Sequence, residues 1–312
     1  MKFFLISTLC LFFCSLVFTT VASADEVSYT GTWACSQYFN GEMPDISLKG
    51  NSLRQIIRIS IPGENLRFHF SNIFGDEELE LLSVHVAKSA GQGTGSIVPE
   101  TDTVITFNKG QENVIIPANS DIISDTIPFS ASTLEELAIT INYGKIPKAL
   151  TGHAGARTNS FIELGNVVSK ETFDGSIKFA RWYTLSAIDV VNTGNTEAIL
   201  CYGDSITDGR GSTTDKQNRW PDIFAEKLQS YPGTQHLAVL NHGIGGSSLY
   251  GQTSPQWPTG NGRFQKDVVE QVNVKYMIVL YGINDIIYGN KDADTLIKGF
   301  KELIQNTHNL GI

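Results

Sequence analysis

The stretch Ala198-Ile199-Leu200-Cys201-Tyr202-Gly203-Asp204-Ser205 decides the fold that we expect for the second half of the chain. Its first five residues form a wholly apolar run, which is typical of a strand covered on both faces in a parallel sheet. The glycine and the polar residues that follow are typical of a turn from such a strand into a helix. The stretch therefore predicts the first strand-and-helix unit of a parallel α/β sheet that begins near residue 196.

Two further strand-and-helix units follow this stretch. A helix is predicted over 220–229, with Pro221 in its first turn, where the missing N–H does no harm. Strands are predicted at 237–240 and 274–281, and the second has only one polar residue, so we expect both of its faces to be covered. The β-α-β-α-β-α order predicts a parallel, doubly wound sheet.

The last helix is predicted to begin at Asp292 or Asp294, either of which can cap it, and to end before Gly311. Its apolar residues recur at helical spacing, so we expect them to share one buried side. They are Leu296, Phe300, Leu303, Ile304 and Leu310.

The first half of the chain has a different period. Between about residues 28 and 144, apolar and polar residues alternate, as around Leu66, Phe68 and Phe70, and turn signals such as Pro62-Gly63 separate the runs. This alternation is typical of antiparallel strands with one buried and one wetted face. We therefore expect a β-sandwich or jelly-roll-like domain over residues 25–195, followed by the α/β domain over residues 196–312.

Residues 1–24 are typical of a secretory signal peptide. Lys2 is followed by an apolar run over 3–21 and then by the small residues Ala22-Ser23-Ala24. The run is also long enough for an uncleaved membrane anchor, but the polar Asp25-Glu26 after the small residues favours cleavage. We expect a secreted protein, or a periplasmic one if the source is a Gram-negative bacterium.

Composition narrows the class of the mature protein. The 312 residues are 41% hydrophobic and 18% charged, which excludes a disordered tail, a collagen and a coiled coil. The net charge of −9 and the lack of a basic run argue against nucleic acid as a partner. No apolar run of about 18 residues follows the signal peptide, so we expect no stable membrane span after cleavage.

Two cysteines, Cys35 and Cys201, lie outside the signal peptide. A disulfide between them is compatible with an oxidising compartment. Two buried thiols in different domains are the preferred interpretation.

A polar or glycine-rich cluster follows each of the three predicted parallel strands. The clusters are 203–207, 243–248 and 282–285. Each alone is an ordinary turn, but ligands of open parallel sheets bind beyond the carboxyl ends of the strands, where the three clusters are expected to meet. Together they suit acyl transfer, with Ser205 as the nucleophile. The Ser205 N–H, the Gly246 N–H and the Asn284 amide are candidate donors to the oxyanion.

These clusters resemble the sequence blocks of the GDSL, or SGNH, hydrolases. Gly203-Asp204-Ser205-Ile206-Thr207 with Asp208-Gly209 resembles the first block, 241–246 the second, and Gly282-Ile283-Asn284-Asp285 the third. The resemblance covers about residues 197–312. It implies a flavodoxin-like sheet with strand order 2-1-3-4-5, hydrolysis of esters without a cofactor, and catalytic roles for Ser205, Gly246 and Asn284.

A looser resemblance reaches into the first half of the chain. Gly31-Thr32-Trp33-Ala34 and Asn218-Arg219-Trp220-Pro221 resemble segments of a secreted, bacterial-type subgroup of that family with an N-terminal β-sandwich domain. Trp33 and Tyr38 are interpreted as core residues rather than as a platform for a sugar.

The last block of the family, Asp-x-x-His, is missing from this sequence. None of the six histidines has an aspartate three positions before it. We therefore expect a chain truncated at its C-terminus, with an incomplete sheet and little or no activity, because the general base is lost. Strand 274–281 is then expected to lie exposed at an edge of the sheet.

The histidines present are expected to have other roles. His242 is interpreted as a turn residue bonded to backbone, and His308 as a cation in the last turn of a helix. His69 and His85 are expected to be solvated, while a substrate-facing role stays open for His153.

The sequence thus predicts a secreted serine esterase or acylhydrolase that acts through an acyl-enzyme on a lipid, an acylated carbohydrate or a small ester. The alternative is an inactive fragment whose β-sandwich binds carbohydrate or a cell surface. Asp204 and Asp285 are interpreted as supports for the turns around Ser205 and Asn284 rather than as an acid pair. No metal-ligand spacing occurs, so no metal is predicted.

Overall fold

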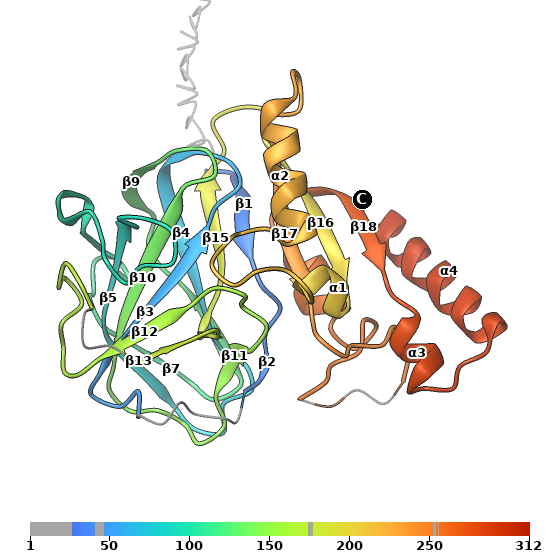
Figure 1. Cartoon of the computed structure of the whole chain (residues 1–312), viewed down its shortest axis with the longest axis horizontal. Coiled ribbons are helices and arrows are strands. Elements are labelled where there is room, and N and C mark those ends of the chain that lie inside the picture. The colour runs from blue at the N-terminus through green and yellow to red at the C-terminus, as the bar shows by residue number, and fades with distance from the viewer. Residues whose placement is uncertain (1–26, 41–46, 174–176, 252–253, 255) are drawn as a thin grey trace, which may run out of the picture.

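The computed structural model describes residues 27–40, 47–173, 177–251, 254 and 256–312 (Figure 1). The predicted signal peptide and its cleavage site lie outside these residues. Antiparallel strands occupy one side of the molecule, and three parallel strands with their helices occupy the other.

The antiparallel part contains two large sheets and a small one. The strands of the first sheet are β1 (Tyr29–Ala34), β4 (Gly63–Asn72), β8 (Ser120–Ile123), β9 (Ile127–Ala131) and β15 (Leu185–Val191). They are ordered β1-β15-β4-β8, with β9 also paired to β4, and all the pairs are antiparallel.

The second large sheet has the order β13-β12-β3-β10-β5-β6, with β7 also paired to β5. Its strands are β3 (Ser52–Arg58), β5 (Leu79–Lys88), β6 (Thr103–Val104), β7 (Val114–Ile116), β10 (Glu136–Tyr143), β12 (Ser160–Glu163) and β13 (Ile177–Phe179). The small sheet consists of β2 (Tyr38–Phe39), β11 (Thr151–His153) and β14 (Trp182–Tyr183). A 3₁₀ turn covers Pro99–Thr101.

The alternation read from the sequence is present in these strands. In β4, Leu66, Phe68 and Phe70 are buried, whereas Arg67 and His69 between them are half-buried. An extended chain points successive side chains to opposite faces, so this pattern directs one face of the strand into the core. The predicted strands around 53–61, 66–71 and 137–143 are therefore confirmed.

The parallel sheet has three strands, β16 (Glu197–Gly203), β17 (Leu237–Gly243) and β18 (Val274–Leu280). Their order is β17-β16-β18, and Gly203 at the carboxyl end of β16 lies opposite Gly243 and Leu280. The three strands therefore end at the same edge of the sheet, as the sequence analysis requires.

Four α-helices accompany these strands in the described part of the chain. They are α1 (Ser205–Asp208), α2 (Trp220–Ser230), α3 (Ile283–Ile287) and α4 (Ala293–Asn309), and a π-helical turn covers Gln265–Val269. Helix α2 packs with Cys201 and Val239 on one face of the sheet. Leu200 and Leu240 face the other way, into the main core. No described helix combines the length and the apolar character needed to cross a membrane.

One apolar core joins the two parts of the molecule. The cluster that contains Ile57 of β3 and Phe68 of β4 also contains Trp33, Leu200 and Leu240. Its continuity shows that the first half of the chain packs directly on the parallel sheet.

The prediction that both faces of strand 274–281 are covered is wrong. Tyr276, Ile278 and Leu280 of β18 are exposed, because β18 is the edge strand and pairs only with β16 among the described strands. The structure instead matches the other prediction for this strand, that it lies exposed at an edge of the sheet.

The buried side of α4 also differs from the prediction. Asp292 caps the helix by accepting a hydrogen bond from Thr295 N, and Leu296 and Leu303 are buried as expected. Ile304 and Leu310, however, are exposed. Ile304 lines a hollow beside Tyr276 and Met277 of the edge strand β18, where no described element covers it.

Cys35 and Cys201 are both buried and unpaired, as the preferred interpretation held. Burial raises the pKa of both thiols far above the ordinary cysteine value, so neither is a reactive thiolate at neutral pH.

Candidate active site

Ser205 is the first residue of α1, directly after β16. Its turn is held by Asp204, whose carboxylate caps the helix by accepting a hydrogen bond from Ile206 N at 3.0 Å. Gly209 ends the helix in a left-handed conformation, with φ +112°, which glycine adopts without strain. The Ser205 side chain is half-buried, and its hydroxyl has no hydrogen-bond partner among the described residues. It is therefore accessible as a nucleophile.

The loop after β17 is attached to the loop of Ser205. Ile244 N donates to Gly203 O at 3.1 Å, and Gly245 N donates to the Asp208 carboxylate at 2.9 Å. Gly246, the next residue, has φ +78° and is exposed. A side chain at Gly243 is excluded, because its Cβ would lie 2.2 Å from Asp208 N.

The loop after β18 is attached to the same region. The Asn284 side-chain nitrogen donates to Ser247 O at 2.9 Å, and the Asn284 side chain is buried. Asp285 is fully buried and accepts hydrogen bonds from Leu249 N and Tyr250 N, both at 2.8 Å. Hydrogen bonds thus join the loops that carry Ser205, Gly246 and Asn284.

Asp204 and Asp285 support turns, as interpreted from the sequence. Asp204 caps α1, and Asp285 holds the loop after Gly246. Burial, together with the like charges of Asp285 and Asp208, raises the pKa of the Asp204 carboxyl. Neither carboxylate is in the position of a free general acid.

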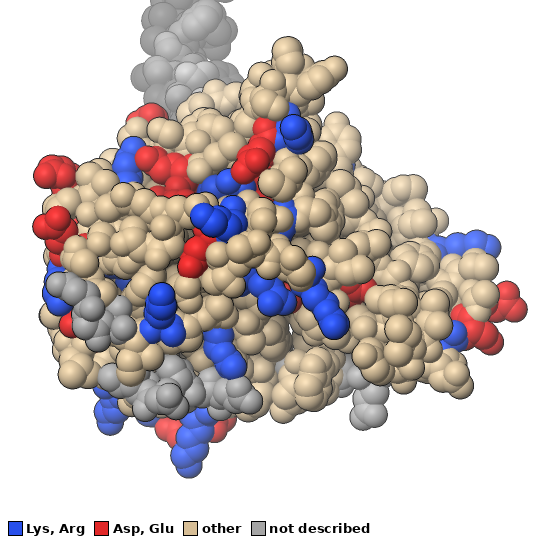
Figure 2. Space-filling model, viewed as in Figure 1, with Lys and Arg blue, Asp and Glu red and all other residues tan. Residues whose placement is uncertain are grey.

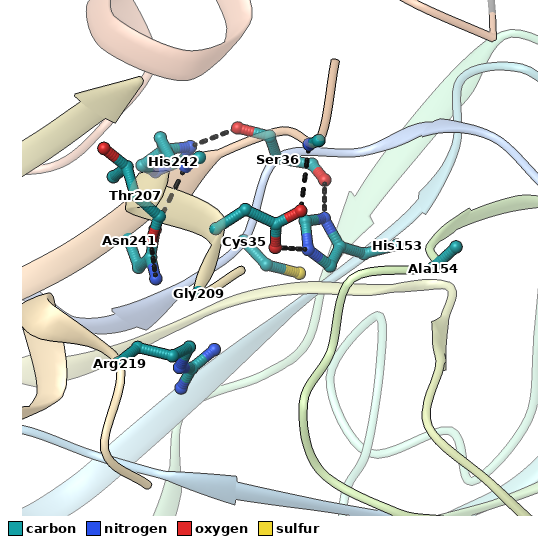
Figure 3. Close-up of polar contacts among 12 residues, drawn as sticks. Cys35, Ser36, His153, Ala154, Thr207, Gly209, Arg219, Asn241 and His242 are labelled. Carbon is teal, nitrogen blue, oxygen red and sulfur yellow. Dashed lines mark hydrogen bonds and ion pairs between the residues drawn. The ribbon is translucent and has the colours of Figure 1, made fainter. Parts of the chain in front are cut away.

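None of the six histidines forms a hydrogen bond with Ser205, and the open role of His153 is resolved against the substrate. His153 is buried, with Nδ1 at 2.8 Å from Ser36 O and Nε2 at 2.9 Å from the Asp208 carboxylate (Figure 3). The two ring nitrogens of His153 thus contact the backbone near β1 and the side chain of Asp208 in α1. His153 therefore joins the β-strand part of the molecule to the helix of Ser205.

The prediction that His242 lies in a turn and bonds to backbone is wrong. It lies in β17, which extends to Gly243, and its Nδ1 is 3.2 Å from the Ser36 hydroxyl (Figure 3). The same hydroxyl donates to the Asp267 carboxylate at 2.7 Å and accepts from Arg263 at 2.6 Å. The Arg263 guanidinium also pairs with Asp267 and donates to Gly203 O at 2.8 Å.

We name Ser36, His242, Arg263 and Asp267 the buried polar cluster. All four side chains are buried. Burial alone raises the pKa of Asp267, but the charge of Arg263, the proximity of His242 and the hydrogen bond from Arg263 bring it down to about 2. Because Arg263 donates to Gly203 O, the cluster supports the strand end from which the Ser205 turn begins.

The cluster makes stability depend on pH. The folded pKa of Asp267 lies below the unfolded value of about 3.9, so its contribution is complete above that value and is lost as the pH falls towards 2. Between pH 5 and pH 2 we expect the free energy of unfolding of the wild type to fall by about 2 kcal/mol because of Asp267. The double variant Arg263→Met/Asp267→Leu should lack this contribution. Urea unfolding of the wild type and the double variant across this pH range measures the difference. Parallel curves of the free energy of unfolding against pH would contradict the lowered pKa of Asp267.

His69 and His85 are not simply solvated, contrary to the expectation. His69 Nε2 lies 2.7 Å from the Asp189 carboxylate, and His85 Nδ1 lies 3.0 Å from the Asp102 carboxylate. Both histidines are half-buried, and each has an acidic partner from another segment of the chain. His308 lies in the last turn of α4, as expected.

The described residues contain no group of three or more His, Cys, Asp or Glu side chains arranged to hold a metal ion. Acidic and basic side chains are interspersed on the face shown in Figure 2, without a continuous basic surface.

Comparison with known proteins supports the family predicted for the second half of the chain. Residues 201–312 match the model of the GDSL-like lipase/acylhydrolase family. No curated protein matches the sequence. The match includes Ser205, Gly246 and Asn284 and leaves the antiparallel part unassigned.

Two solved structures illustrate what the chain is similar to. AlinE4, an SGNH-hydrolase family esterase, is 25% identical, with a TM-score of 0.30 over 37% of this chain and 56% of that chain. A family two carbohydrate esterase from Clostridium thermocellum, in complex with cellohexaose, is 13% identical, with a TM-score of 0.31 over 88% of this chain and 74% of that chain. Both TM-scores lie well below 0.5, so neither likeness assigns a fold or a function to this chain.

Proposed function

We propose that the protein is a secreted serine hydrolase of carboxylic esters that acts through an acyl-enzyme, with a flavodoxin-like catalytic sheet and an N-terminal β-sandwich. The observation that carries the proposal is the placement of Ser205. Its hydroxyl has no described partner at the carboxyl edge of the parallel sheet, in a loop bonded to the loops of Gly246 and Asn284. The family match over residues 201–312 supports the same chemistry.

In the proposed reaction, Ser205 Oγ attacks the acyl carbon and its proton passes to a general base. The carbonyl oxygen becomes an oxyanion, which receives hydrogen bonds from the backbone N–H groups of Ser205 and Gly246 and from the Asn284 amide. The alcohol then leaves with a proton, and water releases the acyl group from Ser205 in a second, equivalent step. None of the six histidines, in its described contacts, is placed to act as that base for Ser205.

Added imidazole tests this proposal on the chain as it stands. A positioned general base contributes about 10²–10⁴-fold to such reactions, and imidazole in solution can take the Ser205 hydroxyl proton in place of such a base. We expect the chain to hydrolyse 4-nitrophenyl acetate at a rate that rises with imidazole concentration, above the rate of imidazole in buffer. A rate equal to that of buffer at every concentration would contradict the proposal and favour a binding role for the β-sandwich.

Asn284 is expected to matter mainly in the transition state. Asn284→Ala should lower the imidazole-dependent rate about 10²–10³-fold, as the loss of one oxyanion donor does elsewhere. Asn309→Ala, an exposed asparagine in α4, is the matched control and should leave the rate unchanged. A rise in KM without a fall in kcat for Asn284→Ala would exclude the oxyanion role.

A further inference from the structure

The Asp208 carboxylate bridges the loop of the proposed oxyanion donor and the β-strand part of the molecule. Its Oδ2 accepts a hydrogen bond from Gly245 N at 2.9 Å, and its Oδ1 lies 2.9 Å from His153 Nε2. Asp208 ends α1, the helix that Ser205 begins. Gly245 directly precedes Gly246, the proposed oxyanion donor. The orientation of this carboxylate therefore bears on the direction of the Gly246 N–H.

His153 is held by the β-strand part through its other ring nitrogen. Nδ1 lies 2.8 Å from Ser36 O, a backbone carbonyl that only accepts, so Nδ1 donates this hydrogen bond (Figure 3). His153 itself lies in β11, and both it and Asp208 are buried. Bulk water therefore cannot take over the contact between the imidazole and the carboxylate.

Two aromatic rings hold the imidazole in place. The Tyr38 ring packs edge-on against His153, with 5.5 Å between the ring centroids, and the Trp182 ring centroid lies 5.8 Å away. The interpretation of Trp33 and Tyr38 as core residues holds only for Trp33, which is buried, whereas Tyr38 is half-buried. The rings and the Ser36 carbonyl together fix the direction of Nε2.

Gly155, two residues after His153, encloses the same carboxylate. A Cβ at Gly155 would lie 2.2 Å from Asp208 Oδ2, the oxygen that accepts from Gly245 N. The segment of His153 and Gly155 thus both bonds the carboxylate and limits the space in which it can turn.

We infer that His153 is a positioning residue for the proposed ester hydrolysis, on which this inference rests. It fixes the Asp208 carboxylate, the carboxylate fixes Gly245 N–H, and the loop then presents Gly246 N–H to the oxyanion. Donors that are already oriented stabilise an oxyanion without reorganisation during the reaction. The antiparallel part of the chain therefore completes the oxyanion site, without His153 touching the substrate.

Two substitutions of His153 separate positioning from mere packing. The amide of His153→Asn reaches the position of Nδ1 and keeps the contact with Ser36 O, whereas the amide of His153→Gln reaches that of Nε2 and keeps the contact with Asp208. Each variant retains one of the two hydrogen bonds, so a purely structural role predicts similar losses for both. Rates are compared where urea unfolding shows that the proteins are folded.

We expect only His153→Asn to disturb the oxyanion donor. Its imidazole-dependent kcat for 4-nitrophenyl acetate should fall at least about tenfold, with KM unchanged, because a misplacement of about 1 Å costs up to about 10²-fold. NMR should show at least about tenfold faster hydrogen exchange at Gly245 N–H. His153→Gln should stay close to the wild type in both measurements. His85→Asn, which removes the contact of His85 with Asp102 near β5, is the control and should also match the wild type.

Gly155→Ala tests the same carboxylate with His153 intact. The added methyl group displaces Asp208 Oδ2, so we expect the same fall in kcat and the same faster exchange at Gly245 N–H. Equal losses in His153→Asn and His153→Gln, a rise in KM alone, or wild-type behaviour of Gly155→Ala would overturn the inference and leave the proposed hydrolysis standing. No imidazole-dependent hydrolysis by the wild type would remove the proposed hydrolysis and the inference with it.

Discussion

The variant Ser205→Ala is expected to lose the imidazole-dependent hydrolysis of 4-nitrophenyl acetate completely. Alanine has no oxygen to form the acyl-enzyme, so only the reaction of imidazole in buffer remains. Loss of the nucleophile costs about 10⁶ in kcat in serine hydrolases with all their catalytic groups. Here imidazole stands in for the base, so the wild-type rate is lower, and we expect the imidazole dependence of the rate for Ser205→Ala to equal that of imidazole in buffer.

Hydrolysis rates at several imidazole concentrations, with and without protein, measure this loss. The difference between the slopes of rate against imidazole concentration isolates the reaction that needs both imidazole and the protein. Ser230→Ala is the matched control, since Ser230 is exposed at the end of α2 and bonds only to Lys227 O among the described residues. Equal slopes for the wild type and Ser205→Ala would show that Ser205 is not the nucleophile.

The second large effect concerns stability rather than activity. Arg263 and Asp267 form an ion pair in the buried polar cluster. Asp267→Leu leaves the guanidinium buried without its carboxylate, and Arg263→Met leaves the carboxylate without its guanidinium. Breaking a buried pair on one side costs about 3–5 kcal/mol, so each single variant should be destabilised by that amount.

The double variant Arg263→Met/Asp267→Leu separates the cost of an unpaired charge from the value of the pair. It buries no isolated charge, so we expect it to be more stable than either single variant. Urea unfolding of the four proteins at neutral pH gives the coupling free energy. Additive effects of the two substitutions would show that the pair is not coupled in the folded protein.

Local pattern was enough to predict several of the long strands and the two longest helices. The alternation around Leu66, Phe68 and Phe70 and the apolar run before Gly203 both became strands, because each pattern directs its side chains to a definite face. Strand β18 shows the limit of this reasoning. An apolar run indicates a strand, but only the neighbouring elements decide whether its faces are covered.

The polar contacts around the site were less accessible to prediction. Arg263 and Asp267 are four residues apart, a spacing that a helix-pair rule can find. Ser36 and His153 are separated by 117 residues, and His153 and Asp208 by 55, so only the packing of the two parts brings them together. The loop glycines and Ser205 were predicted as a site because their types and order fit one reaction.

The central claim is that Ser205, Gly246 and Asn284 form one acyl-transfer site. Mass spectrometry after reaction with a 4-nitrophenyl phosphonate in imidazole buffer tests it most directly. The Ser205 Oγ–P bond forms, 4-nitrophenolate leaves, and imidazole takes the hydroxyl proton. We predict a single adduct on the peptide that contains Ser205, formed more slowly in Asn284→Ala. An adduct on another residue, or equal labelling of Ser205→Ala, would contradict the claim.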